Sequence, residues 1–248
     1  MKNIKLTPEE LKNVIDFGKL IGNGFFGSVF TYKGKLIKMD NILYNLLHVN
    51  DKNVSKDVIT SHYKWGKQDF NNREQLEMLS QKQNKIRPKV PDGIITIKSD
   101  DPKIDGISPG IIIPHFIDYQ SLGNISKTEY RQLLILLRKV FDDIKSLADN
   151  EIAQEDLFTR SKHPDEMSHY NIIQKGNDAQ IIDMSGPLVK VGKDYENPNK
   201  MYTDFANLIN YYNEINGLDK IYQEDDNITE DKLNIMLNEF EKQTNNKK

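Results

Sequence analysis

The stretch GNGFFGSV at residues 22–29 has residue types and a spacing that could bind phosphate. Gly22, Gly24 and Gly27 follow a G-x-G-x-x-G pattern, which Val29 completes. Because glycine lacks a Cβ, main-chain N–H groups in such a loop can approach phosphate oxygens closely. The kind of phosphate-binding loop depends on the elements on either side of the glycines.

The flanking segments predict that the loop joins two strands. Residues 16–40 alternate apolar and polar side chains, interrupted at 22–27 and again at Lys33-Gly34, as in an antiparallel β-meander. A dinucleotide-binding fingerprint needs its glycines between a strand and a helix, and a Walker loop needs Lys-Ser/Thr after the last glycine. Neither context is present, so the sequence favours a glycine loop that covers phosphates from a hairpin.

Polar residues that could complete such a site occur in the second half of the chain. Asp156 comes shortly after a long helical pattern, in LADNEIAQEDLF. Asn171 begins a predicted β-hairpin with its turn at 175–178, and Asp183 follows that hairpin. Asn and Asp oxygens a hairpin apart suit Mg²⁺, a hard cation that combines a few protein ligands with phosphate oxygens.

These features occur in the order found in the protein kinase-like superfamily. The glycine loop comes first, then Lys38 in KLIKM, Asp156 after the long helix, and the pair Asn171 and Asp183 in HYNIIQKGNDAQIIDMSG. The chain resembles a compact, divergent serine/threonine protein kinase of atypical type. The resemblance implies an α+β bilobal fold, with a small antiparallel β-sheet lobe containing one helix at residues 1–117 and a mainly helical lobe at 118–248. ATP and Mg²⁺ would bind between the lobes.

The resemblance also implies a role for individual residues toward ATP. Backbone groups of the glycine loop would contact the phosphates. Backbone groups of His115 to Ile117, which resemble the hinge between the lobes, would contact adenine, and Val29 would cover the base. Lys38 would pair with the phosphates and with a helix carboxylate, either Glu74, which we favour, or Glu77 one turn on. The implied nucleotide-binding residues are Gly22, Asn23, Gly24, Phe25, Phe26, Gly27, Val29, Lys38, Glu74, His115 and Ile117.

Asp156 falls on the family's catalytic aspartate, which orients or deprotonates the acceptor hydroxyl, while Asn171 and Asp183 fall on the metal-binding residues. One departure is the spacing: the family places its Asn five positions after the aspartate, whereas here 171 − 156 is 15. Asp165 lies inside this insertion, in His163-Pro164-Asp165, and is a competing candidate. Asp156 is preferred because the helix and apolar residues before it fit.

Two other departures concern regulation and the acceptor. Gln154 and Glu155 replace the usual His and Arg, and the absence of that Arg favours activity without a phosphorylated activation loop. Only a short stretch separates Gly186 from the predicted helix at 203–215, in which Asp204 resembles the aspartate that opens a central helix of the large lobe.

Three functions therefore stay open: a protein kinase, an aminoglycoside-kinase-like enzyme acting on a small molecule, and an ATP-binding pseudokinase. A cationic small substrate would need an acidic cluster, for which Glu224-Asp225-Asp226 is a candidate.

Periodicity predicts the elements that would hold these residues. A helix begins at Thr7, which with Glu10 can form a capping box. The remaining predictions are helices at 68–86, at 128–149 with a cap at Ser126 or Thr128, at 203–215 and at 229–243, and strands at 90–97 and 109–116 and within 179–192.

Composition excludes several other classes of function. The 34 Lys and Arg against 37 Asp and Glu give a net charge of -3 without a basic run interleaved with aromatics, so nucleic acid is not expected as a partner. With 0 Cys, disulfides and thiolate metal sites are excluded. No apolar stretch reaches the roughly 18 residues of a membrane span, and the first residues lack a signal-peptide pattern. We therefore expect a cytoplasmic protein. Its partners, as the resemblance implies, would be ATP and a protein or small hydroxyl-bearing molecule.

Overall fold

The computed structural model describes residues 1–23, 27–41, 55–66, 73–114, 116, 118–124, 130–160, 169–222 and 227–246. The chain has an α+β fold and forms two compact units. Unit 1 comprises Met1–Ser80 and Val90–His115, and unit 2 comprises Gln81–Lys89 and Phe116–Lys248. The chain passes from unit 1 to unit 2 for the last time after His115, two residues before the boundary predicted after residue 117.

Unit 1 is built on a six-stranded mixed sheet in the order β1-β5-β6-β4-β3-β2. The strands are β1 (Lys2–Leu6), β2 (Lys19–Asn23), β3 (Gly27–Tyr32), β4 (Lys35–Asp40), β5 (Gly93–Ile97) and β6 (Gly110–Ile113). As expected, β3 and β4 form a tight hairpin, and its turn residues Lys33 and Gly34 have positive φ angles of 48° and 73°.

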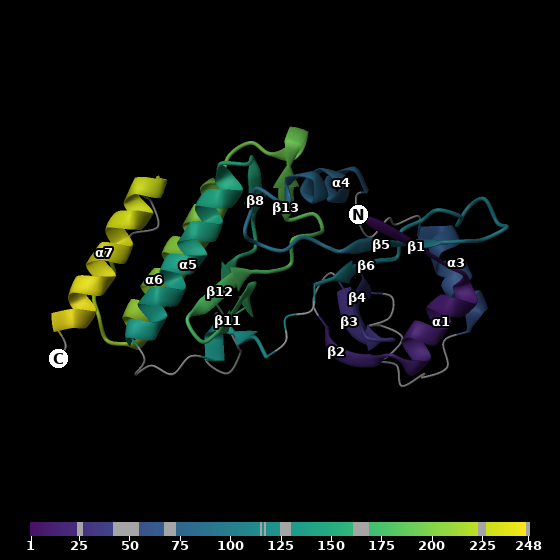
Figure 1. Cartoon of the computed structure of the whole chain (residues 1–248), viewed down its shortest axis with the longest axis horizontal. Helices are drawn as coiled ribbons and strands as arrows, with labels where there is room; N and C mark the ends of the chain where they lie inside the picture. Colours follow the sequence, from purple (N-terminus) through teal and green to yellow (C-terminus); the bar gives the residue numbers. More distant parts are fainter. Residues whose placement is uncertain are drawn as a thin grey trace. The chain divides into compact units, whose positions relative to one another are not determined.

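Among the described residues, the helices α1 (Pro8–Phe17) and α3 (Lys56–Gly66) cover one face of this sheet (Figure 1). Helix α1 starts as predicted, with Thr7 as its N-cap and a complete capping box with Glu10. The core beneath the helices joins side chains from both of them to alternate positions of the strands. Its buried members include Leu11, Val14, Phe30, Ile37, Met39, Ile59, Tyr63, Ile95 and Ile112.

The expectation of an antiparallel sheet with one helix is wrong for unit 1 in two respects. The first strand, β1, pairs parallel with β5, which makes the sheet mixed. Its residues Ile4 and Leu6 pack against the core, while Asn3 accepts a hydrogen bond from Thr96 at 3.0 Å. Both α1 and α3 belong to the unit, as does most of α4 (Arg73–Lys82). Helix α4 ends four residues before the predicted end at 86, and residues 68–72 include positions outside the described ranges.

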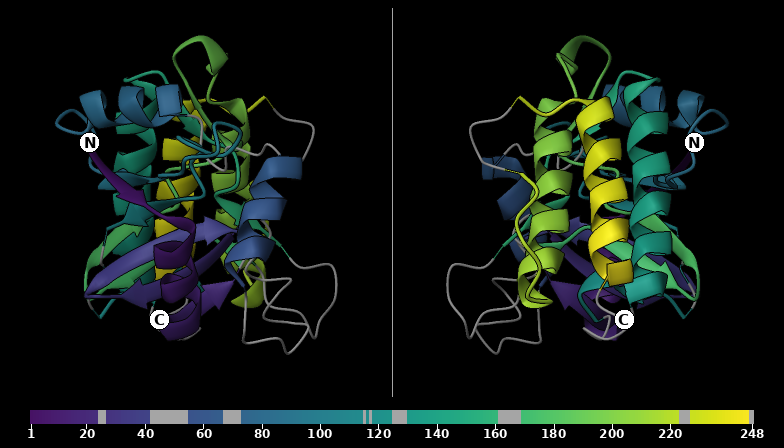
Figure 2. Two further views of the ribbon diagram at one scale, coloured as in Figure 1. Left: turned by 90° about the vertical axis from the view of Figure 1, so that its right-hand side faces the viewer. Right: turned by 90° about the vertical axis from the view of Figure 1, so that its left-hand side faces the viewer.

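Unit 2 contains three long helices with small sheets at their side. The helices are α5 (Tyr130–Ala148), α6 (Asn199–Ile215) and α7 (Glu230–Asn246), and α7 lies between α5 and α6 (Figure 2). The predicted helices are confirmed, with α6 starting four residues earlier than expected. The predicted caps of α5, Ser126 and Thr128, lie outside the described residues.

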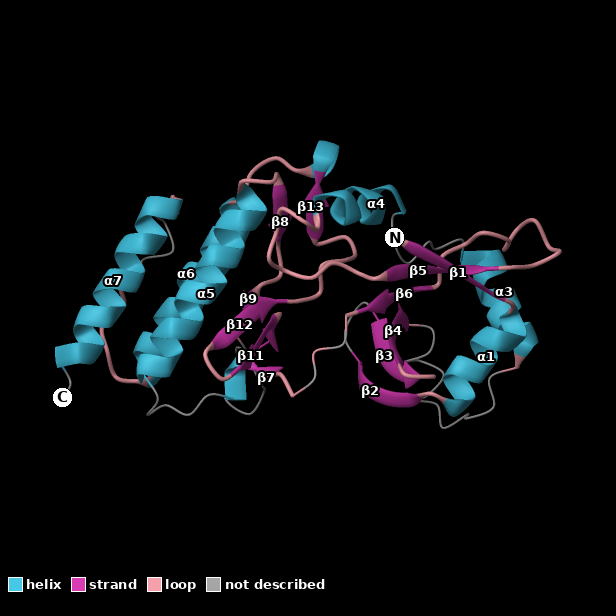
Figure 3. Ribbon diagram, in the orientation of Figure 1, coloured by secondary structure: helices cyan, strands magenta, loops and turns pink. Residues whose placement is uncertain are grey.

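Three small sheets complete unit 2 (Figure 3). The predicted hairpin consists of β11 (Ile172–Lys175) and β12 (Asp178–Ile181), and β7 (Gln120–Ser121) pairs with β11. Strand β8 (Ile152–Gln154) pairs with β13 (Val189–Val191). Strand β9 (Phe158–Thr159) pairs with β10 (His169–Tyr170). A 3-10 turn, η1 (Leu122–Asn124), follows β7, and another, η2 (Gly192–Asp194), follows β13.

A buried ion pair joins the hairpin to α5. The carboxylate of Asp143 is fully buried and accepts hydrogen bonds from Arg87 Nε at 2.5 Å and from Ile181 N in β12 at 3.0 Å. Arg87 also donates to Asp178 at 2.8 Å at the start of β12, and to the carbonyl oxygens of Lys139 and Ala179. One guanidinium thus connects residues 81–89 to both α5 and the hairpin.

We expect Arg87→Ala to lower the free energy of unfolding by about 3–5 kcal/mol, because it leaves the carboxylate of Asp143 buried without its cation. Arg73→Ala is the matched control, since Arg73 pairs with Glu77 at 3.2 Å on the surface, where such pairs contribute about 0–1 kcal/mol. Urea unfolding followed by circular dichroism measures both. Equal losses in the two variants would contradict this role of Arg87. The double substitution Arg87→Met with Asp143→Leu should recover much of the loss, because it leaves no buried charge.

Candidate functional site

The glycine loop connects two paired strands, as the sequence predicts. Gly22 in β2 lies opposite Val29 in β3, and Val29 lies opposite Lys38 in β4. Since directly opposite residues of antiparallel strands point to the same face, these three share one face of the sheet. Phe30 and Ile37 occupy the other face, beneath the helices. The sheet therefore separates the core of unit 1 from the face that carries the expected phosphate-binding residues.

The sheet face that carries Gly22, Val29 and Lys38 is open around Gly22. A Cβ placed at Gly22 would meet no atom within 4 Å, and Asn23 beside it is exposed. Val29 and Lys38 are half-buried. Six other candidate residues lie outside the described residues. They are Gly24, Phe25, Phe26, His115, Ile117 and the competing aspartate Asp165.

The two glutamates considered as partners of Lys38 lie in the first turns of α4. Glu77 forms a surface ion pair with Arg73, with its side chain 55% exposed. Glu74, one turn earlier, is exposed as well. The choice of Glu74 over Glu77 as the partner of Lys38 therefore stays a prediction.

In unit 2 the structure brings Asp156 and Asn171 together. The side-chain Nδ2 of Asn171 donates to the carbonyl oxygen of Asp156 at 2.5 Å and to its carboxylate Oδ2 at 3.3 Å. The main-chain N of Asn171 donates to the carbonyl of Leu157 at 3.1 Å. The segment between them begins and ends as the paired strands β9 and β10, so the chain returns close to Asp156 before Asn171.

Asp183 lies beside Asn171 at the open end of the β11–β12 hairpin. The N–H of Ile182 donates to the carbonyl of Asn171 at 2.9 Å, which joins the two ends of the hairpin. Asp183 has a φ of 60°, a left-handed conformation that is uncommon for residues other than glycine. Ser185 donates to it twice, from N to the carbonyl at 2.8 Å and from Oγ to Oδ1 at 3.2 Å. This local geometry is consistent with a constrained functional position.

A second buried carboxylate holds the backbone next to Asp156. Asp204 in α6 is 2% exposed and accepts a hydrogen bond from Leu157 N at 3.1 Å, and it also pairs with Lys200. Its pKa is raised to about 6, mainly because burial disfavours the charged form. The same cause raises the pKa of Asp143 to about 6.

Several contacts around Asp156 were not anticipated from the sequence. The Oε1 of Gln154 accepts from Asp156 N at 2.6 Å, so this residue supports the turn before the aspartate. Thr159 Oγ1 donates to Asp156 Oδ1 at 3.4 Å. Glu155 N donates to the carbonyl of Leu188 at 2.8 Å, beside the β8–β13 pairing. The role of Asp143 did have a sequence signal, because it is an acidic residue within the apolar stripe of the 128–149 helix.

The chemistry of Asp156, Asn171 and Asp183 is that of hard oxygen ligands. Since Nδ2 of Asn171 is used by Asp156, its Oδ1 is the atom suited to a cation. Within the described part of the chain, no group of three or more His, Cys, Asp or Glu side chains could hold a metal on its own. Asp156, Asn171 and Asp183 supply two carboxylates and one amide, so a cation bound there would need further oxygen ligands. In Mg²⁺ sites that bind nucleotides, the phosphates supply such oxygens.

No protein-family model matches the sequence, and no curated protein matches it either. Among the described helices, none combines the length and apolar character needed to cross a membrane.

We expect the stability of the folded protein to fall as pH rises from about 4 to 6. Asp143 and Asp204 have folded-state pKa values near 6, above the usual 3.8, so in this interval the folded state binds more protons than the unfolded state. Each group then lowers the free energy of unfolding by up to about 1.4 kcal/mol per pH unit, and its effect levels off above its folded pKa. Denaturant unfolding at pH 4.5, 5.5, 6.5 and 7.5 measures this slope.

Asp143→Asn should flatten the slope, because an amide does not titrate. Asp142→Asn, at the exposed neighbour on the same helix, is the control and should leave the slope unchanged. A slope that persists undiminished in Asp143→Asn would contradict the assignment to Asp143.

Proposed function

We propose that the protein is an ATP-dependent phosphotransferase with a bilobal kinase-like fold, acting as an atypical serine/threonine protein kinase. The observation that carries the proposal is the meeting of Asp156, Asn171 and Asp183 within unit 2. They are far apart in sequence, yet Asn171 contacts Asp156 through its side chain, and the backbone hydrogen bond from Ile182 N to Asn171 O places the residue before Asp183 next to Asn171. The fixed left-handed backbone of Asp183 adds support.

The proposed roles follow from the chemistry of each side chain. Asp156 would orient the acceptor hydroxyl and accept its proton at a carboxylate oxygen. Asn171 Oδ1 and the Asp183 carboxylate would hold Mg²⁺, which neutralises charge on the transferring phosphoryl group when bound. Lys38 and the main-chain N–H groups of the glycine loop would bind phosphate oxygens, with Glu74 pairing with Lys38. Positioning and charge neutralisation would account for the rate.

The assignment of Asp156 is supported by two backbone contacts besides the bond from Asn171. Gln154 holds its N–H, and Asp204 holds the N–H of the next residue, Leu157. A general base benefits from such a fixed position, because the acceptor hydroxyl must approach within hydrogen-bond distance.

The alternative functions receive less support. An aminoglycoside-like acceptor needs unpaired carboxylates, but the described pocket next to Asp156 contains only Asp204 and Glu214, and each is paired with a basic side chain. Residues 223–226, the acidic candidate cluster, lie outside the described residues. A pseudokinase is less favoured because the insertion leaves Asn171 in contact with Asp156.

We expect purified protein to transfer label from radiolabelled ATP with Mg²⁺ to itself or to a generic protein acceptor. Asp183→Ala and Lys38→Ala should each reduce transfer by at least about 100-fold, since positioned charges in such sites typically contribute about 10²–10³. Asp156→Asn should have a comparable effect and Asp165→Asn little effect. The reverse order of the two aspartate variants would assign catalysis to Asp165.

Thermal unfolding with and without ATP and Mg²⁺ supplies a separate readout of binding. Stabilisation by ATP without transfer to protein would move the assignment to a small-molecule kinase or a pseudokinase, and a panel of small hydroxyl acceptors would distinguish them. No stabilisation and no transfer would overturn the proposed function.

A further inference from the structure

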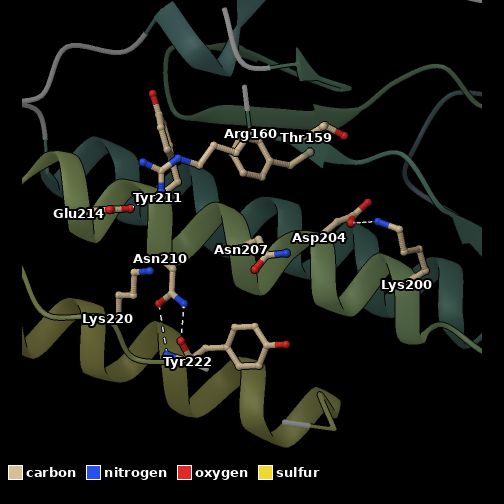
Figure 4. A pocket seen from close by; sticks show the side chains of 11 residues that line it. Thr159, Arg160, Lys200, Asp204, Asn207, Asn210, Tyr211, Glu214, Lys220 and Tyr222 are labelled. Atoms are coloured by element: carbon tan, nitrogen blue, oxygen red, sulfur yellow. Dashed lines mark hydrogen bonds and ion pairs between the residues drawn. The ribbon is translucent and has the colours of Figure 1, made fainter. Parts of the chain in front are cut away.

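A polar pocket of about 560 Å³ lies along α6 in unit 2 (Figure 4). Residues of α6 form its floor, β9 with Arg160 forms one wall, and the segment 220–222 forms the other. The lining residues are Phe158, Thr159, Arg160, Lys200, Asp204, Asn207, Asn210, Tyr211, Glu214, Lys220 and Tyr222. We refer to it as the α6 pocket.

The α6 pocket is continuous with the candidate site. Thr159 lines the pocket and donates a hydrogen bond to the Asp156 carboxylate at 3.4 Å. Asp204 lines it and holds the N–H of Leu157 at 3.1 Å. A molecule bound in this pocket would therefore lie next to the carboxylate proposed to receive the acceptor hydroxyl.

The dimensions suit an extended peptide. From Lys200 to Glu214 the helix rises by about 20 Å, at about 1.5 Å per residue. An extended chain of about six residues spans the same length, at about 3.3 Å per residue. Midway along this face lies Asn207, half-buried, whose amide makes no hydrogen bond to another described residue. An unpaired amide at this position could bond to a peptide backbone.

The charges of the described lining favour an acidic peptide. Three basic side chains, Arg160, Lys200 and Lys220, face two carboxylates. Glu214 is paired with Arg160, and Asp204 is buried and paired with Lys200. Lys220 is exposed, and in the part of the chain that the structure describes it forms no ion pair. Since the other two basic side chains pair with the two carboxylates, the net positive charge of the described lining resides on Lys220.

The wall that carries Lys220 is held in place. Asn210 in α6 donates from Nδ2 to the carbonyl of Tyr222 at 2.7 Å, and its Oδ1 accepts from Ile221 N at 3.0 Å and from Tyr222 N at 3.3 Å (Figure 4). This buried amide fixes the backbone next to Lys220 against the helix. On the opposite wall, Arg160 lies over the ring of Tyr211 with 5.7 Å between its guanidinium carbon and the ring centroid.

From this geometry we infer that the α6 pocket is the docking site for an acidic peptide segment of a protein acceptor, with Lys220 as a specificity-determining residue. The inference rests on the proposed function for the transfer step, but binding to the pocket can be measured without it. Acidic side chains flanking the acceptor Ser or Thr would interact with Lys220.

The test uses the full chain and two fluorescein-labelled decapeptides, each with one Ser, flanked in one case by Glu and in the other by Lys. Fluorescence anisotropy without ATP measures binding, and radiolabelled ATP with Mg²⁺ measures transfer to the same peptides. We expect the Glu peptide to bind at least about tenfold more tightly, with affinity that decreases as salt is raised. Lys220→Glu should abolish this preference. Lys232→Glu, the same charge change at an exposed position on α7, is the control and should retain it.

Equal binding of the two peptides, tighter binding of the Lys peptide, or equal effects of the Lys220 and Lys232 variants would each overturn the inference. The second of these outcomes would point to carboxylates at 224–226 as the recognising groups. Lys220-dependent binding of the Glu peptide without phosphate transfer would support the pocket and count against the proposed kinase activity. Transfer to both peptides without preference would support the kinase activity and refute the acidic docking site.

Discussion

The buried carboxylate of Asp143 is the constraint on which the arrangement of unit 2 depends. An ion of this kind is costly to remove from water, and the cost is offset only where cations and N–H groups surround it. Arg87 and Ile181 N supply those partners. Their positions fix β12 against α5, and with it the hairpin whose two ends carry Asn171 and Asp183. A polar interaction inside an apolar layer thus specifies one register, which apolar packing alone leaves less defined.

Asp204 acts in a similar way on the segment that carries Asp156. Its carboxylate accepts from Leu157 N, so α6 holds the backbone one residue beyond the candidate base. Both carboxylates have a pKa raised to about 6, which shows that burial outweighs the effect of their hydrogen bonds and cations. Each therefore lowers stability at neutral pH relative to a neutral group. What they provide instead is a defined position for Asp156, Asn171 and Asp183.

The parts of the fold that sequence reasoning predicted are those determined by local patterns. The Thr7 cap, the Lys33-Gly34 turn and the long apolar face of α5 depend on residues close together in the chain. The parallel pairing of β1 with β5 was missed because it joins residues about ninety positions apart, and nothing within residues 2–6 identifies the partner. Residues 55–66 likewise drew no helix prediction, although Ile59 and Tyr63, one turn apart, are both buried in the core.

The candidate site likewise contains residues that the sequence suggested and residues that it did not. The roles proposed for Lys38, Asp156, Asn171 and Asp183 come from a resemblance in sequence order. The role of Arg87 had no sequence signal, since it acts from a segment far from its partners. In the sequence, the long spacing between Asp156 and Asn171 suggested that the two residues lie apart. The pairing of β9 with β10 brings the chain back toward Asp156, so Asn171 contacts it despite that spacing.

The short connection after Asp183 explains why a face of α6 lines a pocket. Between Asp183 and the start of α6 at Asn199, residues 189–191 pair with β8 and residues 192–194 form a 3-10 turn. Little chain is left to cover the face that carries Lys200, Asn207 and Glu214. On the proposed kinase function, this connection is too short to present an acceptor peptide in the manner of typical protein kinases. If the protein acts on a peptide, the acceptor must then be held by other elements, and the exposed polar face of α6 next to Asp156 is positioned to do so.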